Sequence, residues 1–175
     1  MRSPSRWAIR LPRTTKEIAL IGAFGALLFA AQVALSFLPN IELVSLLVIV
    51  FTLVFGGKVL PMLGVFILLE GLLYGFGIWW ASYLYLWPAL AGITWLFRKV
   101  QGALGWALIS AAFGLSFGAL CAIPYFLTGG WAAGLSYWVS GIPFDLAHCG
   151  GNFVAALALY APLRRALERL QHALL

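Results

Sequence analysis

Charged residues are scarce in this chain. Only 9% of its 175 residues are charged, whereas 63% are hydrophobic. A soluble domain of this size needs more polar surface than that to cover itself, so the composition excludes an ordinary soluble fold. Several apolar runs approach the ~20 residues that a helix needs to cross a bilayer. The sequence therefore predicts an all-α integral membrane protein built as one domain.

Residues with catalytic or metal-binding chemistry are also few. The chain contains a single aspartate, and its two cysteines, Cys121 and Cys149, lie in apolar segments without a CxxC spacing. A Walker-type loop, an HExxH motif and the paired aspartates of a membrane aspartyl protease are all missing. The stretch Trp138–Gly141 lacks the first glycine of an intramembrane serine protease motif. We therefore expect no metal, no cofactor and no ATP hydrolysis by such a loop.

Six apolar stretches are predicted to span the membrane as a helical bundle. Short breaks separate them, except for one longer connection at 128–143 that is rich in Gly, Trp and Ser. Pro39 is expected in the first turn of the second span, and Pro124 is expected to kink or end the fifth. The predicted spans are 18–38, 39–57, 59–77, 81–97, 103–127 and 144–163. They leave a basic arm at 1–17 and a short tail at 164–175.

The basic residues indicate the orientation. With six spans, all eleven Lys and Arg residues fall on the side that carries both termini. The positive-inside rule makes that side the cytoplasmic side. The expected location is a bacterial-type cell membrane. The net charge of +6 is therefore a topology signal, and it does not indicate nucleic-acid binding. The N-terminal arm is placed to contact anionic lipid.

Three of the five acids belong to the outer half of this arrangement. Glu42 and Asp145 are expected in the first turns of the second and sixth spans, where the helix dipole favours a carboxylate, so each is either a cap or a ligand contact. Glu70 lies about 18 Å along a helix from Lys58, deep in the bilayer. An acid at that depth must face protein or a water-filled cavity. It is either protonated and bonded to a neighbouring helix or, with Tyr74 one turn on, part of an outward pocket.

Polar and aromatic residues also gather on the outer side. Asp145, His148 and Asn152 are spaced i, i+3, i+7 and form one stripe of the sixth span. Ten of the fourteen Trp and Tyr residues lie toward the outside, which is more lopsided than two membrane-interface belts would require. Tyr83 and Trp87 share a helix face there. These features favour a cavity that stacks on a flat ligand.

Small residues line the first span. They lie close together at helical spacing, and Gly25 is expected to widen the same smooth face. Such rows let helices approach closely in lipid, so the surface serves either packing within the bundle or docking of another membrane protein. The residues predicted for docking are Ala19, Gly22, Ala23, Ala26 and Ala30.

This pattern resembles the S components, the substrate-capture subunits, of energy-coupling factor (ECF) vitamin transporters. The resemblance covers nearly the whole chain. It rests on the six-helix architecture, the small-residue first helix and four stretches of sequence. These are Leu38–Leu43 (LPNIEL), Leu69–Gly77 (LEGLLYGFG), Tyr83–Pro88 (YLYLWP) and Gly141–Phe153 (GIPFDLAHCGGNF).

The resemblance implies a function and partners. An S component binds a vitamin or vitamin precursor near the outer surface, at a site closed by loops between spans. It delivers the molecule inward together with a transmembrane coupling protein and two ATPase subunits, and it docks through an AxxxA-like surface on its first helix. Which vitamin is bound stays open, with flavin, thiamine, folate, a pyrimidine precursor and a corrinoid as candidates.

The predicted substrate-binding residues combine the outer acids, the polar stripe and the outer aromatics. They are Asn40, Glu42, Glu70, Tyr74, Tyr83, Trp87, Trp138, Asp145, His148 and Asn152. Two other interpretations remain: an intramembrane enzyme that uses Asp145 and His148, and a Trp-rich membrane sensor or structural protein.

Overall fold

The computed structural model describes residue 12 and residues 14–174, and over these residues the chain is helical and contains no strand. Most of the predicted basic arm at 1–17 lies outside the described residues. The elements are α1 (Thr15–Ala34), α2 (Val44–Phe55), the short 3-10 helix η1 (Gly56–Lys58), α3 (Val59–Tyr74), α4 (Ile78–Leu96), α5 (Gly102–Cys121) and α6 (Ile123–Leu174).

Four segments within the described residues are long and apolar enough to cross a membrane. They are Thr15–Ala34, Val44–Tyr74, Gly102–Cys121 and Ile123–Ala173. The second of these runs through α2 and α3 and turns at Gly56, whose φ of 62° interrupts the helix. The chain is therefore a multi-pass membrane protein. α4 is of similar length, but its many Trp and Tyr residues lower its hydropathy.

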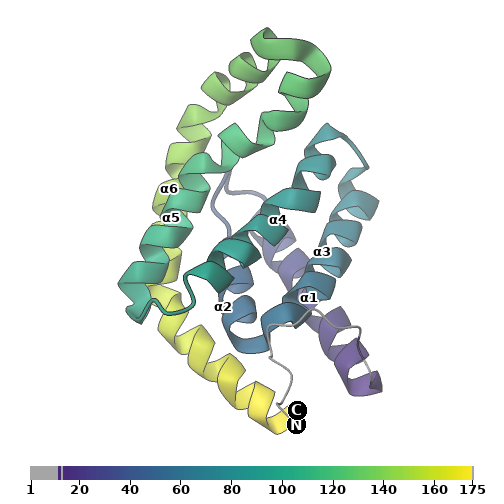
Figure 1. The fold of residues 1–175 in the computed structure, drawn as a ribbon, viewed down its shortest axis with the longest axis vertical. Coiled ribbons are helices and arrows are strands. Elements are labelled where there is room, and N and C mark those ends of the chain that lie inside the picture. The colour runs from purple at the N-terminus through teal and green to yellow at the C-terminus, as the bar shows by residue number, and fades with distance from the viewer. Residues whose placement is uncertain (1–11, 13, 175) are drawn as a thin grey trace.

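The helices pack around α2. α5 and α6 run side by side along one edge of the molecule, and α1 packs against α3 on the other side (Figure 1). All twelve residues of α2 are buried. A helix that is apolar around its whole circumference is covered on every side, and here other helices cover it. At ~1.5 Å per residue, α2 is only about 18 Å long, shorter than the ~30 Å hydrocarbon layer.

The predicted start of the second span is wrong. Residues 39–43 are not helical, and α2 begins at Val44. Asn40 has a φ of 56°, a left-handed conformation that stops a helix from running through it. The carboxylate of Glu42 accepts a hydrogen bond from the Ser45 backbone N–H at 2.8 Å, which satisfies one open donor of the first turn. Because it is not part of a helix, the connection before α2 can line the cavity described below, and residues 39–42 do so.

The predicted loop at 128–143 is also wrong, because that stretch is helical. The helix is interrupted only at Gly130, where φ is 73° and ψ is −173°. The short helical piece before this break folds back on the long one after it, and the rings of Tyr125 and Tyr137 stack at 4.1 Å. Gly134 lies against the ring of Phe126, where any Cβ would collide with it. Figure 1 shows this hairpin at the top of the molecule.

Most of the other boundaries agree with the sequence within a few residues, but the end of the sixth span is wrong, because the tail predicted at 164–175 is helical as far as Leu174. α5 ends at Cys121, and Pro124 lies at the start of the next helix, where the missing N–H costs nothing. After Gly130, α6 continues to Leu174, which is about 66 Å at ~1.5 Å per residue. Since the hydrocarbon layer is only ~30 Å thick, this helix extends well beyond it.

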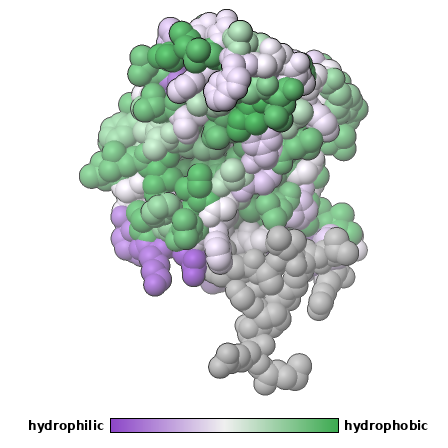
Figure 2. All heavy atoms as spheres, turned by 45° about the horizontal axis from the view of Figure 1, so that its top comes forward, coloured by the Kyte–Doolittle hydropathy of each residue, from purple (hydrophilic) through white to green (hydrophobic). Residues whose placement is uncertain are grey.

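One end of the molecule carries the described basic residues. Lys58 pairs with Glu17 at 2.8 Å, which brings η1 to the start of α1. The Gln171 side chain donates to the Val54 carbonyl at 2.8 Å and brings the end of α6 to the end of α2. In Figure 2, most of the strongly hydrophilic atoms on the visible face gather at one end of a largely hydrophobic surface.

The small residues of α1 divide between two faces. Ala19, Ala23, Ala26 and Ala30 are exposed. Gly22 has open space where a Cβ would stand. Gly25 lies on the opposite, buried face, where a Cβ would stand 2.7 Å from the Met62 carbonyl oxygen of α3. Gly25 therefore does not widen the exposed row, as the sequence had indicated, but lets α1 pack closely on α3.

Candidate ligand-binding cavity

A cavity of about 410 Å³ opens between the ends of several helices. It involves the C-terminal end of α1, the C-terminal half of α3 and the N-terminal half of α4. These are the opposite helix ends from Glu17, Lys58 and Arg98, so the cavity lies away from the basic end. It is lined by Gln32, Leu35, Ser36, Leu38, Pro39, Asn40, Ile41, Glu42, Glu70, Tyr74, Trp79, Tyr83, Trp87, Phe117 and His148.

Glu42 and His148 form a buried pair in the cavity wall. The Nε2 atom of His148 lies 3.1 Å from Oε1 of Glu42, and the two residues are only 3% and 8% exposed. The other carboxylate oxygen of Glu42 accepts from the Ser45 N–H. Nδ1 of His148 has no hydrogen-bond partner among the described residues. Glu42 therefore caps α2 and lines the cavity at once, so the two roles do not exclude one another.

Glu70 has no such partners. It is 2% exposed, and its Oε1 atom has no hydrogen-bond partner within the described part of the chain. The side chain comes from α3 and lines the cavity opposite the connection before α2. A buried carboxyl group without a partner is costly, so it needs a specific reason to be there. The first alternative for Glu70, a hydrogen bond to a neighbouring helix, is not seen among the described residues.

An aromatic row forms another wall. Trp79, Tyr83 and Trp87 follow one face of α4, with ring centroids 5.3 Å apart for Trp79–Tyr83 and 5.4 Å apart for Tyr83–Trp87. Trp79 and Tyr83 are half-buried, whereas Trp87 is 1% exposed and its Nε1 atom has no hydrogen-bond partner among the described residues. The row therefore leads from the opening to the floor. Tyr74, which is 49% exposed, stands at the rim.

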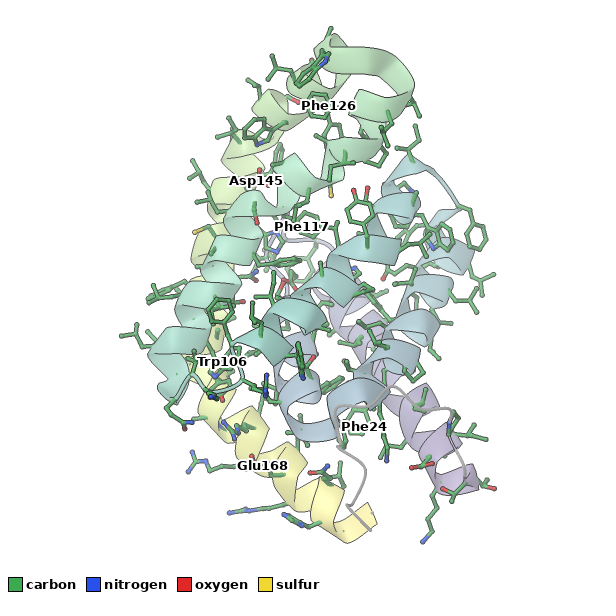
Figure 3. All side chains as sticks on the ribbon, in the orientation of Figure 1. Phe24, Trp106, Phe117, Phe126, Asp145 and Glu168 are labelled. Carbon is green, nitrogen blue, oxygen red and sulfur yellow. The ribbon has the colours of Figure 1, made fainter. Side chains whose placement is uncertain are left out.

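Asp145 lies beside a second, smaller cavity of about 300 Å³. Contrary to the prediction, it is not in a first helical turn, because α6 extends far ahead of it. Its Oδ1 atom accepts from the Gly118 N–H of α5 at 2.8 Å, while Oδ2 has no partner among the described residues. The side chain is 3% exposed. Asp145 thus joins α5 to α6, and Figure 3 shows it between these helices, near Phe117.

The polar stripe of α6 mainly faces α5. The Asn152 side chain donates to the Ser110 carbonyl at 3.2 Å, is 2% exposed and lines neither cavity. Asp145 and His148 bond to different partners, and of the stripe only His148 reaches the larger cavity. Trp138 is 40% exposed and also lines neither cavity.

Sequence reasoning missed several contributors, among them Trp79 of the aromatic row. Gln32 lines the larger cavity, and its Oε1 atom has no partner in the described part. Phe117 lines both cavities and contacts the His148 ring edge-on at 4.9 Å. Gly114 and Gly118 let α6 approach α5, since a Cβ at Gly114 would stand 2.9 Å from the backbone of His148. The four-residue spacing of these glycines was the available signal.

No family model, curated protein or solved structure matches this chain. Within residues 12 and 14–174, no cluster of three or more His, Cys, Asp or Glu side chains could hold a metal ion. The cavity and the position of the charged residues are therefore the features that bear on function.

Proposed function

We propose that this chain is the membrane-embedded binding subunit of an importer of the ECF type. In this proposal it captures a vitamin or vitamin precursor from outside the cell. It then delivers the molecule inward together with a transmembrane coupling protein and two ATPase subunits. The observation that carries the proposal is the cavity of about 410 Å³, which combines aromatic walls with buried polar atoms that lack partners. Binding sites for small molecules have this composition.

The proposed topology places the cavity on the outer side. It has six spans and both termini in the cytoplasm, with α4 and the α2 segment counted as spans. Its support is that Lys58, Arg98 and the end of α6 lie away from the cavity, as the positive-inside rule requires. The segment before α2 and the helical hairpin around Gly130 would then be the outer parts that border the binding site.

The exposed face of α1 is the proposed docking surface for the coupling protein. Ala19, Ala23, Ala26 and Ala30 are exposed, and Gly22 leaves open space beside them. Replacing Ala23 and Ala26 by leucine should prevent co-purification of the coupling protein and the ATPases. The matched control is Leu104→Trp, an equally large change at an exposed position of α5. Intact complexes in the double leucine variant would disprove this surface.

The enzyme alternative finds little support in the geometry. Asp145 bonds to the Gly118 N–H and His148 to Glu42, so the two side chains do not act as a bonded pair. An enzyme would convert a bound compound when isolated, and His148→Ala would abolish the turnover. A binding subunit would return the compound unchanged.

The most informative experiment is mass spectrometry of small molecules that stay bound to the gently purified, full-length protein. The proposal expects one compound of vitamin type at close to one molecule per chain, and uptake of that compound should cease on deletion of the gene. A protein that retains nothing, and whose loss leaves vitamin uptake unchanged, would instead fit the sensor or structural interpretation.

A further inference from the structure

The lining of the cavity contains more acidic than basic side chains. Two carboxyl groups, from Glu42 and Glu70, and one imidazole, from His148, line it, and no Lys or Arg of the described residues does. Glu42 shares its charge with the histidine and with a backbone N–H. Glu70 forms no ion pair among the described residues and is 2% exposed. A buried carboxylate without a partner is costly, and a cation placed against it supplies the missing counter-charge.

The hydrogen-bonding atoms of the cavity also favour a ligand that carries N–H donors. The Oε1 atoms of both Glu70 and Gln32 are buried acceptors without a donor among the described residues. They lie in the wall of one cavity, from α3 and α1. Since each buried acceptor needs a donor, a fitting ligand presents N–H groups to this side. The buried Nε1 of Trp87 is the complementary donor and calls for one acceptor atom in the ligand.

The aromatic row favours a flat cation. Trp79, Tyr83 and Trp87 stand edge to face along α4, and Tyr83 and Trp87 both pack on Phe66. Aromatic faces attract cations, with tryptophan the strongest, and the attraction grows when water is excluded. Positively charged planar nitrogen heterocycles and amidine-like groups combine a delocalised positive charge, N–H donors and a flat shape that stacks against rings.

We infer that the cavity selects a planar, positively charged nitrogen compound, with its N–H donors against Glu70 and Gln32 and its flat face against the aromatic row of α4. This inference rests on the proposed binding function and adds the class of ligand. It argues against recognition of a phosphate or a free carboxylate by an ion pair in this cavity, because among the described residues no basic side chain except His148 lines it.

The test is a calorimetric titration of the full-length chain in lipid nanodiscs with three probes of different charge. Thiamine is the cationic probe with an aminopyrimidine ring, riboflavin is the neutral one and folate is the anionic one. We expect thiamine alone to bind. Glu70→Gln keeps the shape of the side chain and removes its charge, so thiamine binding should weaken ten- to hundredfold. Glu168→Gln, near the C-terminal end of α6 and outside the cavity lining, is the control and should bind thiamine as the unaltered protein does.

The outcomes separate this inference from the proposed function. Tight binding of riboflavin or folate, or thiamine binding that survives Glu70→Gln, overturns the charge selectivity and leaves a binding subunit in place. If no probe binds, the compounds that stay bound through purification are identified instead. A neutral or anionic compound among them overturns this inference but leaves the proposed binding function in place. A retained planar cation that Glu70→Gln releases supports it. A protein that binds and retains nothing refutes both. The melting temperature of Glu70→Gln, measured without probes, shows that the variant is folded.

Discussion

The contact between Gly118 and Asp145 makes the sharpest stability prediction. The backbone N–H of Gly118 donates to Oδ1 of Asp145 at 2.8 Å, and a Cβ on Gly118 would collide with the same carboxylate. Gly118→Ala therefore forces the two helices apart and stretches a hydrogen bond to a buried acid. Overpacking costs about 1–3 kcal/mol and a hydrogen bond to a charged group is worth ~1.5–3 kcal/mol. We expect a loss of about 2–4 kcal/mol, since the two effects overlap.

The chain offers a matched control for this substitution. Gly92 lies within α4, and a Cβ there would meet nothing within 4 Å. Gly92→Ala should therefore leave stability unchanged or raise it by up to ~1 kcal/mol, because alanine is the better helix former. The assay is unfolding of the purified protein in mixed micelles, followed by circular dichroism. If both alanine variants unfold alike, α6 does not approach α5 through Gly118, and the placement of Asp145 is wrong.

Three further predictions follow from contacts elsewhere. Gly25→Ala should destabilise the protein by about 1–3 kcal/mol through overpacking against α3. Gly22→Ala is the control and should not, because a Cβ there meets open space. Equal melting temperatures of the two variants would contradict the packing of α1 on α3. Glu42→Ala removes the cap of α2 and should lower the free energy of unfolding by ~1–2 kcal/mol, measured in the same micelles; an unchanged value would argue against the capping bond. In a variant without native cysteines, a cysteine at Thr128 should react with a membrane-impermeant maleimide applied to intact cells, and one at Gln101 should react only after lysis; the reverse pattern would invert the proposed topology.

The sequence predicted the helical class, the multi-pass character and most helix ends because these depend on apolar length and on strong stop signals. It failed at 128–143, where Gly, Ser and Trp are typical of a loop. A helix forms there despite weak local propensities because the two helical pieces pack on each other, as the stack of Tyr125 on Tyr137 shows. The start of α2 was misplaced because the helix is capped by a side chain from outside it, that of Glu42.

The candidate site was predicted in part. Most of the residues chosen for ligand binding line the larger cavity, because an acid or an aromatic pair in an apolar helix is conspicuous in a sequence. Asp145 and Asn152 have the same appearance, yet they bond to the Gly118 N–H and the Ser110 carbonyl of α5. Helical spacing shows that residues share a face but not which neighbour that face meets. Gln32 and Phe117 were missed because neither is unusual at the end of a span.

The three outer acids therefore differ in the number of hydrogen bonds that they make within the protein. Within the described part of the chain, Glu42 makes two bonds and Asp145 makes one, whereas Glu70 makes none. Burying an acid without partners lowers stability, and such a cost persists at sites that serve function. Glu70→Gln should thus leave the empty protein at least as stable as before, while Glu42→Gln should lower its melting temperature. If Glu70→Gln were the more destabilising of the two, Glu70 would be a structural residue, and the cavity would lose its best-supported ligand contact.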